Sequence, residues 1–235
     1  MLRHFILYTS LFCGTLSLTS CKDNAPMLNT TPQPATTYTY LALGDSYTIG
    51  ESVPEADQWG VQLAALLRNE GVNVSNPTTI ARTGWTTSEL AEAITAANLT
   101  HAFDLVSLLI GVNNQYRGQS IETYRSEFKE LLQTSVRLAK GNPAHVIVLS
   151  IPDWGVTPFA QGRDRQRIAA EIDAFNAVAE EEAQKTGVTF INITPLTRKY
   201  GNNAVYLASD GLHYAGKMHR EWALLALPKA QKILK

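Results

Sequence analysis

Residues 103–110 and 146–151 are almost continuously apolar, and they constrain the fold of this chain more than any other feature. A strand with one face in water alternates apolar and polar residues, whereas a strand covered on both faces is apolar at nearly every position. Such runs are typical of parallel sheets covered by helices. Residues 38–43, 72–74 and 188–193 are further β-prone segments, so we expect about five strands.

Segments with helical spacing of apolar residues lie between these strands, at residues 57–70, 86–98, 120–140, 163–186 and 214–235. Thr86 and Glu89 have the spacing of a capping box at a helix start. Pro228 is expected to kink the last helix. Alternating strands and helices predict a single domain over residues 38–235, a three-layer, flavodoxin-like α/β/α sandwich around a mainly parallel sheet.

The first 20 residues resemble a bacterial lipoprotein signal peptide, with an apolar stretch too short to span a membrane comfortably. It ends in Leu18-Thr19-Ser20-Cys21, similar to a lipobox, which implies that Cys21 carries the lipid. Residues 21–37 would then be the lipidated cysteine and a Pro/Thr-rich tether, anchoring the domain in the bacterial cell envelope. A plain secretory signal or an uncleaved anchor is the alternative.

Composition argues against several other classes of protein. The formal net charge is −1 and no basic stripe is present, so we expect no nucleic-acid partner. None of the five histidines has a convincing metal-ligand spacing, so we expect no metal site. Cys13 lies within the signal segment, which leaves the domain without cysteine and hence without disulfide or thiol chemistry.

Four short polar segments are candidates for chemistry. Gly44-Asp45-Ser46 presents a small hydroxyl directly after the first strand, and Asp210 precedes His213 by three residues just before the last helix. A carboxylate that holds one imidazole nitrogen leaves the other free to accept a hydroxyl proton. Gly84 precedes a helix start, and Gly111-Val112-Asn113 follows the most apolar strand. Each segment alone is also compatible with an ordinary turn.

Together and in this order, the four segments resemble the blocks of the GDSL esterases, the SGNH hydrolase family. That resemblance implies that Ser46 is the nucleophile, His213 the general base and Asp210 the residue that orients it. It also implies an oxyanion hole formed by the main-chain N–H groups of Ser46 and Gly84 and the Asn113 side chain, with no cofactor. The expected activity is hydrolysis of carboxylic esters.

One position departs from the family pattern. The third block usually ends in Asp, where this chain has Asn114, so the change falls on loop support rather than on the oxyanion donor. The chain has no Gly-x-Ser-x-Gly segment, which argues against the α/β-hydrolase fold despite the shared order of Ser, Asp and His.

The substrate is less constrained. Six aromatic residues could line a pocket, and Trp85 and Tyr116 are favoured because they adjoin family blocks; the others are Tyr47, Trp154, Phe159 and Tyr206. Arg163, Arg165 and Arg167 are interpreted as a solvated helix start. We expect a monomer that acts on a small-molecule or glycan ester. A carbohydrate O-acetyl esterase of this family and a non-catalytic surface binding protein are the alternatives.

Overall fold

The computed structural model describes residues 1–2 and 37–235. The expected signal peptide at residues 1–20, the lipidation site Cys21 and the tether up to residue 36 therefore lie outside the described residues. Within the described part of the chain, no helix combines the length and apolar character needed to cross a lipid bilayer.

The domain is built on a five-stranded sheet in which every neighbouring pair is parallel. The spatial order is β2-β1-β3-β4-β5. The strands are β1 (Tyr40–Gly44), β2 (Thr78–Ala81), β3 (Leu105–Leu109), β4 (Val146–Leu149) and β5 (Thr189–Ile191). The residues of β1, β3 and β4 are all buried, as the continuous apolar runs predict. The predicted α/β class with a parallel sheet is confirmed.

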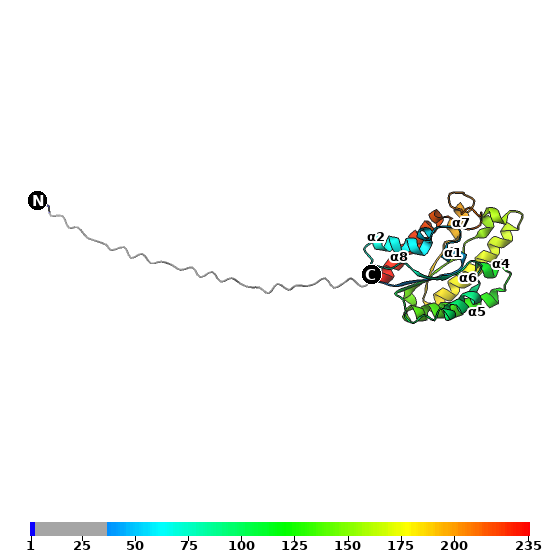
Figure 1. Ribbon diagram of the computed structural model, residues 1–235, viewed down its shortest axis with the longest axis horizontal. Coiled ribbons are helices and arrows are strands. Elements are labelled where there is room, and N and C mark those ends of the chain that lie inside the picture. The colour runs from blue at the N-terminus through cyan, green and yellow to red at the C-terminus, as the bar shows by residue number, and fades with distance from the viewer. Residues whose placement is uncertain (3–36) are drawn as a thin grey trace. The chain divides into compact units, whose positions relative to one another are not determined.

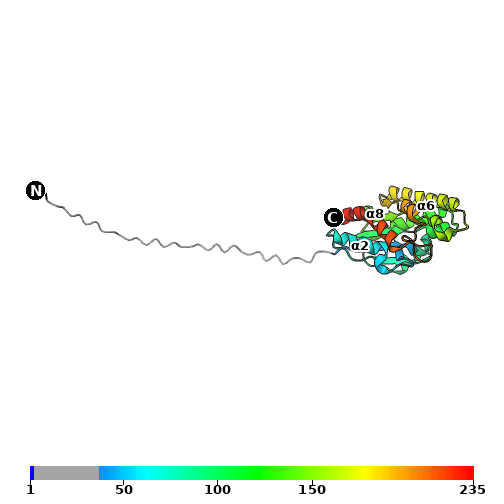
Figure 2. The same cartoon turned by 90° about the horizontal axis from the view of Figure 1, so that it is seen from above.

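Helices cover both faces of the sheet (Figure 1). α2 (Trp59–Asn69) packs with α8 (Gly216–Leu234), and α5 (Ile121–Leu138) packs with α6 (Arg165–Thr186) and α3 (Thr87–Ala96). Figure 2 shows α2 and α6 on opposite sides of the domain. The shorter helices are α1 (Ser46–Ile49), α4 (Val112–Tyr116), α7 (Thr194–Tyr200) and the 3₁₀ turns η1 (Glu55–Asp57), η2 (Pro143–His145), η3 (Trp154–Val156) and η4 (Pro158–Ala160).

The prediction of a strand at residues 72–74 is wrong. The strand that follows α2 is β2, which begins four residues after Val74, and Val74 itself forms only an isolated bridge with Tyr38. β2 lies at the edge of the sheet, where Thr78 is exposed and the other three residues are half-buried. An edge strand needs no continuous apolar run, so hydrophobic pattern alone favours the more apolar segment before it.

The ends of the long helices follow local signals in the sequence. The capping box at the start of α3 is present, with the Thr86 main-chain N–H donating to Glu89 Oε2 at 2.7 Å. α6 ends at Gly187, which has a left-handed φ of 77°. α8 begins at Gly216, two residues later than expected, and continues through Pro228 to Leu234.

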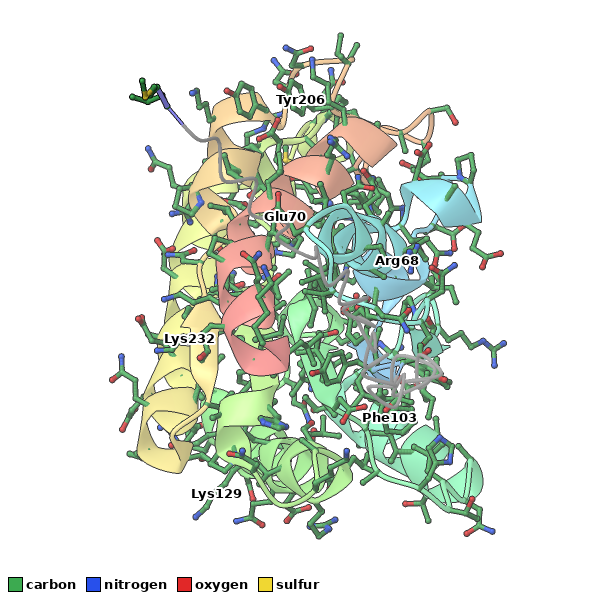
Figure 3. All side chains as sticks on the ribbon, turned by 90° about the vertical axis from the view of Figure 1, so that its left-hand side faces the viewer. Arg68, Glu70, Phe103, Lys129, Tyr206 and Lys232 are labelled. Carbon is green, nitrogen blue, oxygen red and sulfur yellow. The ribbon has the colours of Figure 1, made fainter. Side chains whose placement is uncertain are left out.

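Packing between α2 and α8 depends on a buried histidine. His219 Nδ1 accepts a hydrogen bond from the first main-chain N–H of α2, that of Trp59, at 3.1 Å. Burial lowers the pKa of His219 to about 3, so its imidazole is neutral and can accept this bond at physiological pH. Charged side chains such as Lys129 on α5 and Lys232 on α8 lie on the outer faces instead (Figure 3).

Candidate active site

The polar segments singled out in the sequence follow strands that all run in the same direction. Ser46 follows β1, Gly84 follows β2 and Asn113 follows β3. In a parallel sheet the carboxyl ends of the strands lie at one edge, where α/β proteins bind their ligands. The topology therefore brings these three segments to the same edge of the sheet.

Ser46 is positioned by close packing at the end of β1. A Cβ atom at Gly44 would lie 2.4 Å from the Leu109 carbonyl oxygen and 2.1 Å from Thr48 Oγ1, so only glycine fits there. Ser46 is the first residue of α1, where main-chain N–H groups have no partner within the helix. The residue is only 4% exposed. Its N–H and its hydroxyl are thus held at a helix start at the edge of the sheet.

Asp45, next to Ser46, is fully buried and caps α1. Its Oδ1 accepts a hydrogen bond from the Tyr47 main-chain N–H at 3.0 Å, and no described residue donates to its Oδ2. Burial raises the pKa of Asp45 to about 7. A carboxyl with one oxygen unpartnered in the protein interior is more stable in its protonated form.

Asp210 and His213 form the pair that their spacing predicts. His213 Nδ1 lies 2.7 Å from Asp210 Oδ2, while Asp210 Oδ1 accepts the main-chain N–H groups of Leu212 and His213 at 2.9 Å each. Ser52 Oγ also donates to Asp210 Oδ2, at 2.9 Å. Burial opposes ionisation of Asp210, but these hydrogen bonds outweigh it and lower the pKa to about 2. The carboxylate is therefore charged at neutral pH and fixes the ring of His213.

The loop that carries His213 is anchored from both sides. Leu207 and Tyr214 form an antiparallel bridge, and the Ala208 N–H donates to the His213 carbonyl oxygen at 2.9 Å. Tyr214 is fully buried, and its hydroxyl donates to the carbonyl oxygen of Asp153 at 3.0 Å, beyond the end of β4. These contacts hold the imidazole at the same sheet edge as Ser46.

Of the two remaining oxyanion candidates, Asn113 is hydrogen-bonded to Trp85, the residue after Gly84. Asn113 Nδ2 donates to the Trp85 carbonyl oxygen at 2.9 Å, which uses one of its two hydrogens and orients the other. Gly84 has a left-handed φ of 87°, and its N–H donates to no main-chain carbonyl in the described part of the chain. Both groups thus retain an N–H that can serve as a donor.

Asn114 has a structural position, as its departure from the family pattern suggests. It is fully buried; its Oδ1 accepts from the Thr87 N–H at 3.2 Å and its Nδ2 donates to Thr87 Oγ1 at 2.6 Å and to Gln119 Oε1. Thr87 Oγ1 and Gln119 Nε2 in turn donate to Glu127. Because both partners give their hydrogens to Glu127, their oxygens face Asn114, and position 114 must supply an NH₂ group.

A cavity of about 220 Å³ brings four of the candidate residues together, whereas Gly84 and Asp210 are not among its lining residues. Ser46, Asn113, Tyr116 and His213 line it. The remaining walls are Tyr47, Val112, Trp154, Phe159 and Leu212. Among the described residues, no hydrogen bond joins the Ser46 hydroxyl to His213, an arrangement that is common in enzymes without bound substrate.

Not every aromatic residue named from the sequence lies at this cavity. Trp85 is half-buried and absent from the lining, to which it contributes only by orienting Asn113 through its carbonyl oxygen. Tyr206 instead stacks on Tyr200. Trp154 and Phe159, which were not favoured from the sequence, line the cavity. Both lie in the segment between β4 and α6, and this position after a strand was the signal that could have identified them.

Comparison with known proteins identifies the family. Residues 42–221 match the model of the GDSL-like lipase/acylhydrolase family, which covers more than half of the chain. The chain belongs to this family. The predicted resemblance is thereby confirmed.

Solved structures share the fold of this GDSL-family chain. The crystal structure of TesA superposes with a TM-score of 0.66 over 83% of this chain and 99% of TesA, at 19% sequence identity. Axe2, an acetylxylan esterase from Geobacillus stearothermophilus, superposes with a TM-score of 0.62 over 82% of this chain and 94% of Axe2, at 18% identity. At these identities the likeness establishes a common fold.

A sequence relative is much longer. The chain is 29% identical over 177 residues to an N-acylneuraminate cytidylyltransferase of Streptococcus agalactiae. That alignment covers 74% of this chain but 34% of the relative. The chain thus spans about a third of the relative's length.

The buried carboxyl of Asp45 generates a prediction for pH dependence. Its folded-state pKa of about 7 lies above the unfolded value, so the protein loses stability as pH rises from about 4 to about 7. Asp45→Asn keeps the acceptor for Tyr47 and removes the titration. We expect the stability of the wild type relative to this variant to fall by roughly 2–4 kcal/mol between pH 4 and pH 7.5. Urea unfolding of both proteins at both pH values measures this difference. The same change in the free energy of unfolding for the wild type and the variant would contradict the prediction.

A double-mutant cycle tests the network around Asn114. Asn114→Asp faces the oxygens of Thr87 and Gln119 with a carboxylate, while Glu127 keeps their hydrogens. We expect a loss of about 2–3 kcal/mol in the free energy of unfolding. Adding Glu127→Gln frees both partners to turn toward position 114 and should recover about 1–2 kcal/mol of it. Strictly additive effects of the two substitutions in chemical unfolding would show that the network is not coupled as described.

Proposed function

We propose that this chain is a serine hydrolase that cleaves carboxylic esters through an acyl-enzyme on Ser46. The observation that supports it most directly is that Ser46 and His213 line one cavity, with the carboxylate of Asp210 2.7 Å from Nδ1 of His213. Membership of the GDSL-like lipase/acylhydrolase family supports the same reaction class.

In the proposed reaction His213 is the general base. Its Nδ1–H donates to Asp210, which leaves Nε2 unprotonated and able to take the proton of the Ser46 hydroxyl as Oγ attacks the ester carbonyl. The ionised carboxylate of Asp210 then stabilises the imidazolium. His213 passes the proton to the departing alcohol, and water, deprotonated by the same imidazole, releases the acid from Ser46.

The developing oxyanion would receive three neutral donors. These are the Ser46 N–H at the start of α1, the N–H of Gly84 and the second Nδ2 hydrogen of Asn113. Donors held before the reaction need no reorganisation as charge develops, which makes such sites effective. In this scheme Asn114 positions Asn113 and contributes no hydrogen bond of its own, and no cofactor takes part.

A carbohydrate O-acetyl esterase is the second candidate. The catalytic cavity, at about 220 Å³, is small and suits a short acyl group. Tyr116 and Phe159 are 47% and 41% exposed at its mouth and offer aromatic faces on which a sugar ring could stack. The likeness in fold to an acetylxylan esterase agrees with this candidate. A non-catalytic binding role is less favoured, because the Ser, His and Asp set is complete.

We also propose that Cys21 carries a lipid that anchors the protein in the bacterial cell envelope. This proposal rests on the resemblance of residues 18–21 to a lipobox. Membrane fractionation of the wild type and of Cys21→Ser tests it, since the variant should leave the membrane fraction or remain unprocessed.

The nucleophile assignment predicts that Ser46→Ala loses all measurable esterase activity and all labelling by a fluorophosphonate probe. The substitution removes only the attacking oxygen, so the fold should be retained. Ser126→Ala, on the exposed surface of α5, is the matched control and should label like the wild type. Retention of more than a few per cent of wild-type turnover by Ser46→Ala on p-nitrophenyl acetate would overturn the assignment.

The oxyanion hole predicts a different result for Asn113→Ala. A donor that acts mainly in the transition state affects kcat more than KM, and one such donor typically contributes about 10²–10³ in kcat. The variant should therefore be slow but measurable, with KM on p-nitrophenyl acetate nearly unchanged. A rise in KM with kcat preserved would instead assign Asn113 to substrate binding.

A further inference from the structure

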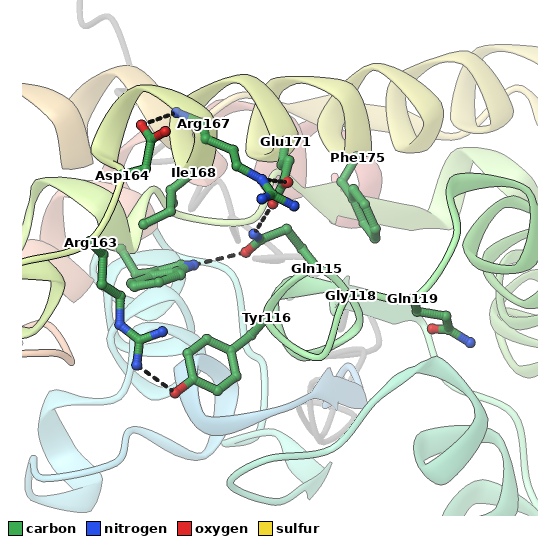
Figure 4. Close-up of a pocket in the computed structure, with 11 residues that line it drawn as sticks. Gln115, Tyr116, Gly118, Gln119, Arg163, Asp164, Arg167, Ile168, Glu171 and Phe175 are labelled. Atoms are coloured by element: carbon green, nitrogen blue, oxygen red, sulfur yellow. Dashed lines mark hydrogen bonds and ion pairs between the residues drawn. The ribbon is translucent and has the colours of Figure 1, made fainter.

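A second cavity, of about 460 Å³, adjoins the catalytic cavity and shares two aromatic walls with it. Tyr116 and Trp154 line both cavities. Beyond these rings the second cavity is lined mainly by polar and charged side chains, among them Gln115 and Arg163 (Figure 4). A ligand bound at Ser46 can therefore extend across the two rings into polar surroundings.

Arg163 lies over the aromatic residues at this boundary. Its guanidinium carbon is 5.5 Å from the centroid of the Tyr116 ring, 5.6 Å from that of Trp154 and 5.7 Å from that of Phe159. Its Nη2 also lies 3.4 Å from the Tyr116 hydroxyl, a long hydrogen bond (Figure 4). All three rings line the catalytic cavity, and Arg163 is exposed and lines the neighbouring cavity, so the cation lies beside the candidate active site.

The charge of Arg163 is not neutralised by a carboxylate in the described part of the chain. Arg167, on the same cavity wall, is paired with Glu171 at 2.7 Å, and Asp164 caps α6 by accepting the Arg167 main-chain N–H. Arg165 donates to the Thr157 carbonyl oxygen. The three arginines are exposed, as the interpretation of a solvated helix start predicts, and Arg163, which precedes α6, also lines the second cavity.

Four of the five N–H donors of the Arg163 guanidinium have no partner among the described residues. A guanidinium held on aromatic faces in this way is suited to bind an anion through two parallel hydrogen bonds. The catalytic cavity is small and partly walled by Val112 and Leu212, which suits the acyl group. With the acyl group in this cavity, the remainder of an ester would extend across Tyr116 and Trp154 toward Arg163.

We propose that Arg163 selects esters whose alcohol portion carries a carboxylate, held by the guanidinium while the alcohol packs on Tyr116 and Trp154. This inference rests on the proposed esterase function and names the substrate class of that site. Arg163 is thus a specificity-determining residue and takes no part in the bond-breaking steps.

The test compares matched esters that differ only in charge. Acetyl esters of para- and meta-hydroxybenzoate are assayed beside those of the corresponding hydroxybenzamides, and each kcat/KM is divided by the rate of uncatalysed hydrolysis. We expect the wild type to favour the carboxylate in at least one pair by about tenfold or more, as for a hydrogen bond to a charged group. Arg163→Gln should lose this preference, and Arg163→Lys should keep part of it.

Arg165→Gln is the matched control, because it removes the same charge two residues away and outside both cavities. It should keep the preference. The inference is overturned if the wild type shows no preference, if Arg163→Gln retains it, or if both glutamine variants lose it equally. Failure of the proposed function has a separate readout, since Ser46→Ala would then still hydrolyse all four esters.

Discussion

The close contact between the ends of β1 and β3 is the constraint on which the site depends. Gly44 lies against the carbonyl oxygen of Leu109, closer than any side chain would allow, and the two strands pair in parallel register up to these residues. The segments that follow, with Ser46 on one and Asn113 on the other, consequently emerge side by side. The hydroxyl and the candidate oxyanion donor are therefore placed by strand packing rather than by any bond between them.

The same packing explains why much of the fold could be predicted. β3 and β4 are covered on both faces, and this burial is visible in the sequence as nearly continuous apolar runs. Thr86 and Glu89 mark the start of α3 through a local capping box. β2 was misplaced because an edge strand is under a weaker constraint: its outer side has no partner strand, and Thr78 is exposed. The hydrophobic pattern of a sequence reflects burial, so it predicts the position of partly buried strands less well than that of fully buried ones.

Prediction of the site was similarly uneven. Asp210 and His213 are three residues apart, so their contact depends on one turn and can be read locally. The contacts of Asn114 reach Thr87, 27 positions away, and depend on the packing of α3. Trp154 lies after a strand in a segment without periodicity, and only the folded chain places it beside Tyr116. Proximity to a motif in the sequence favoured Trp85, whereas proximity in space favours Trp154.

The charges around the cavity are separated in a way that fits the proposed chemistry. Asp210 is ionised and contacts Nδ1 of His213, where it would stabilise the imidazolium of the proposed reaction. Asp45, one residue from Ser46, is held largely protonated below pH 7 by burial, which limits negative charge beside the proposed oxyanion donors. Arg163 places a positive charge over the rings of Tyr116 and Trp154, in the neighbouring cavity. A cation next to Ser46 would bind an anionic ester equally well before and during the reaction, which does not accelerate the chemical step. At the position of Arg163, the cation can bind the alcohol portion of the ester, and the reacting carbonyl interacts only with neutral donors.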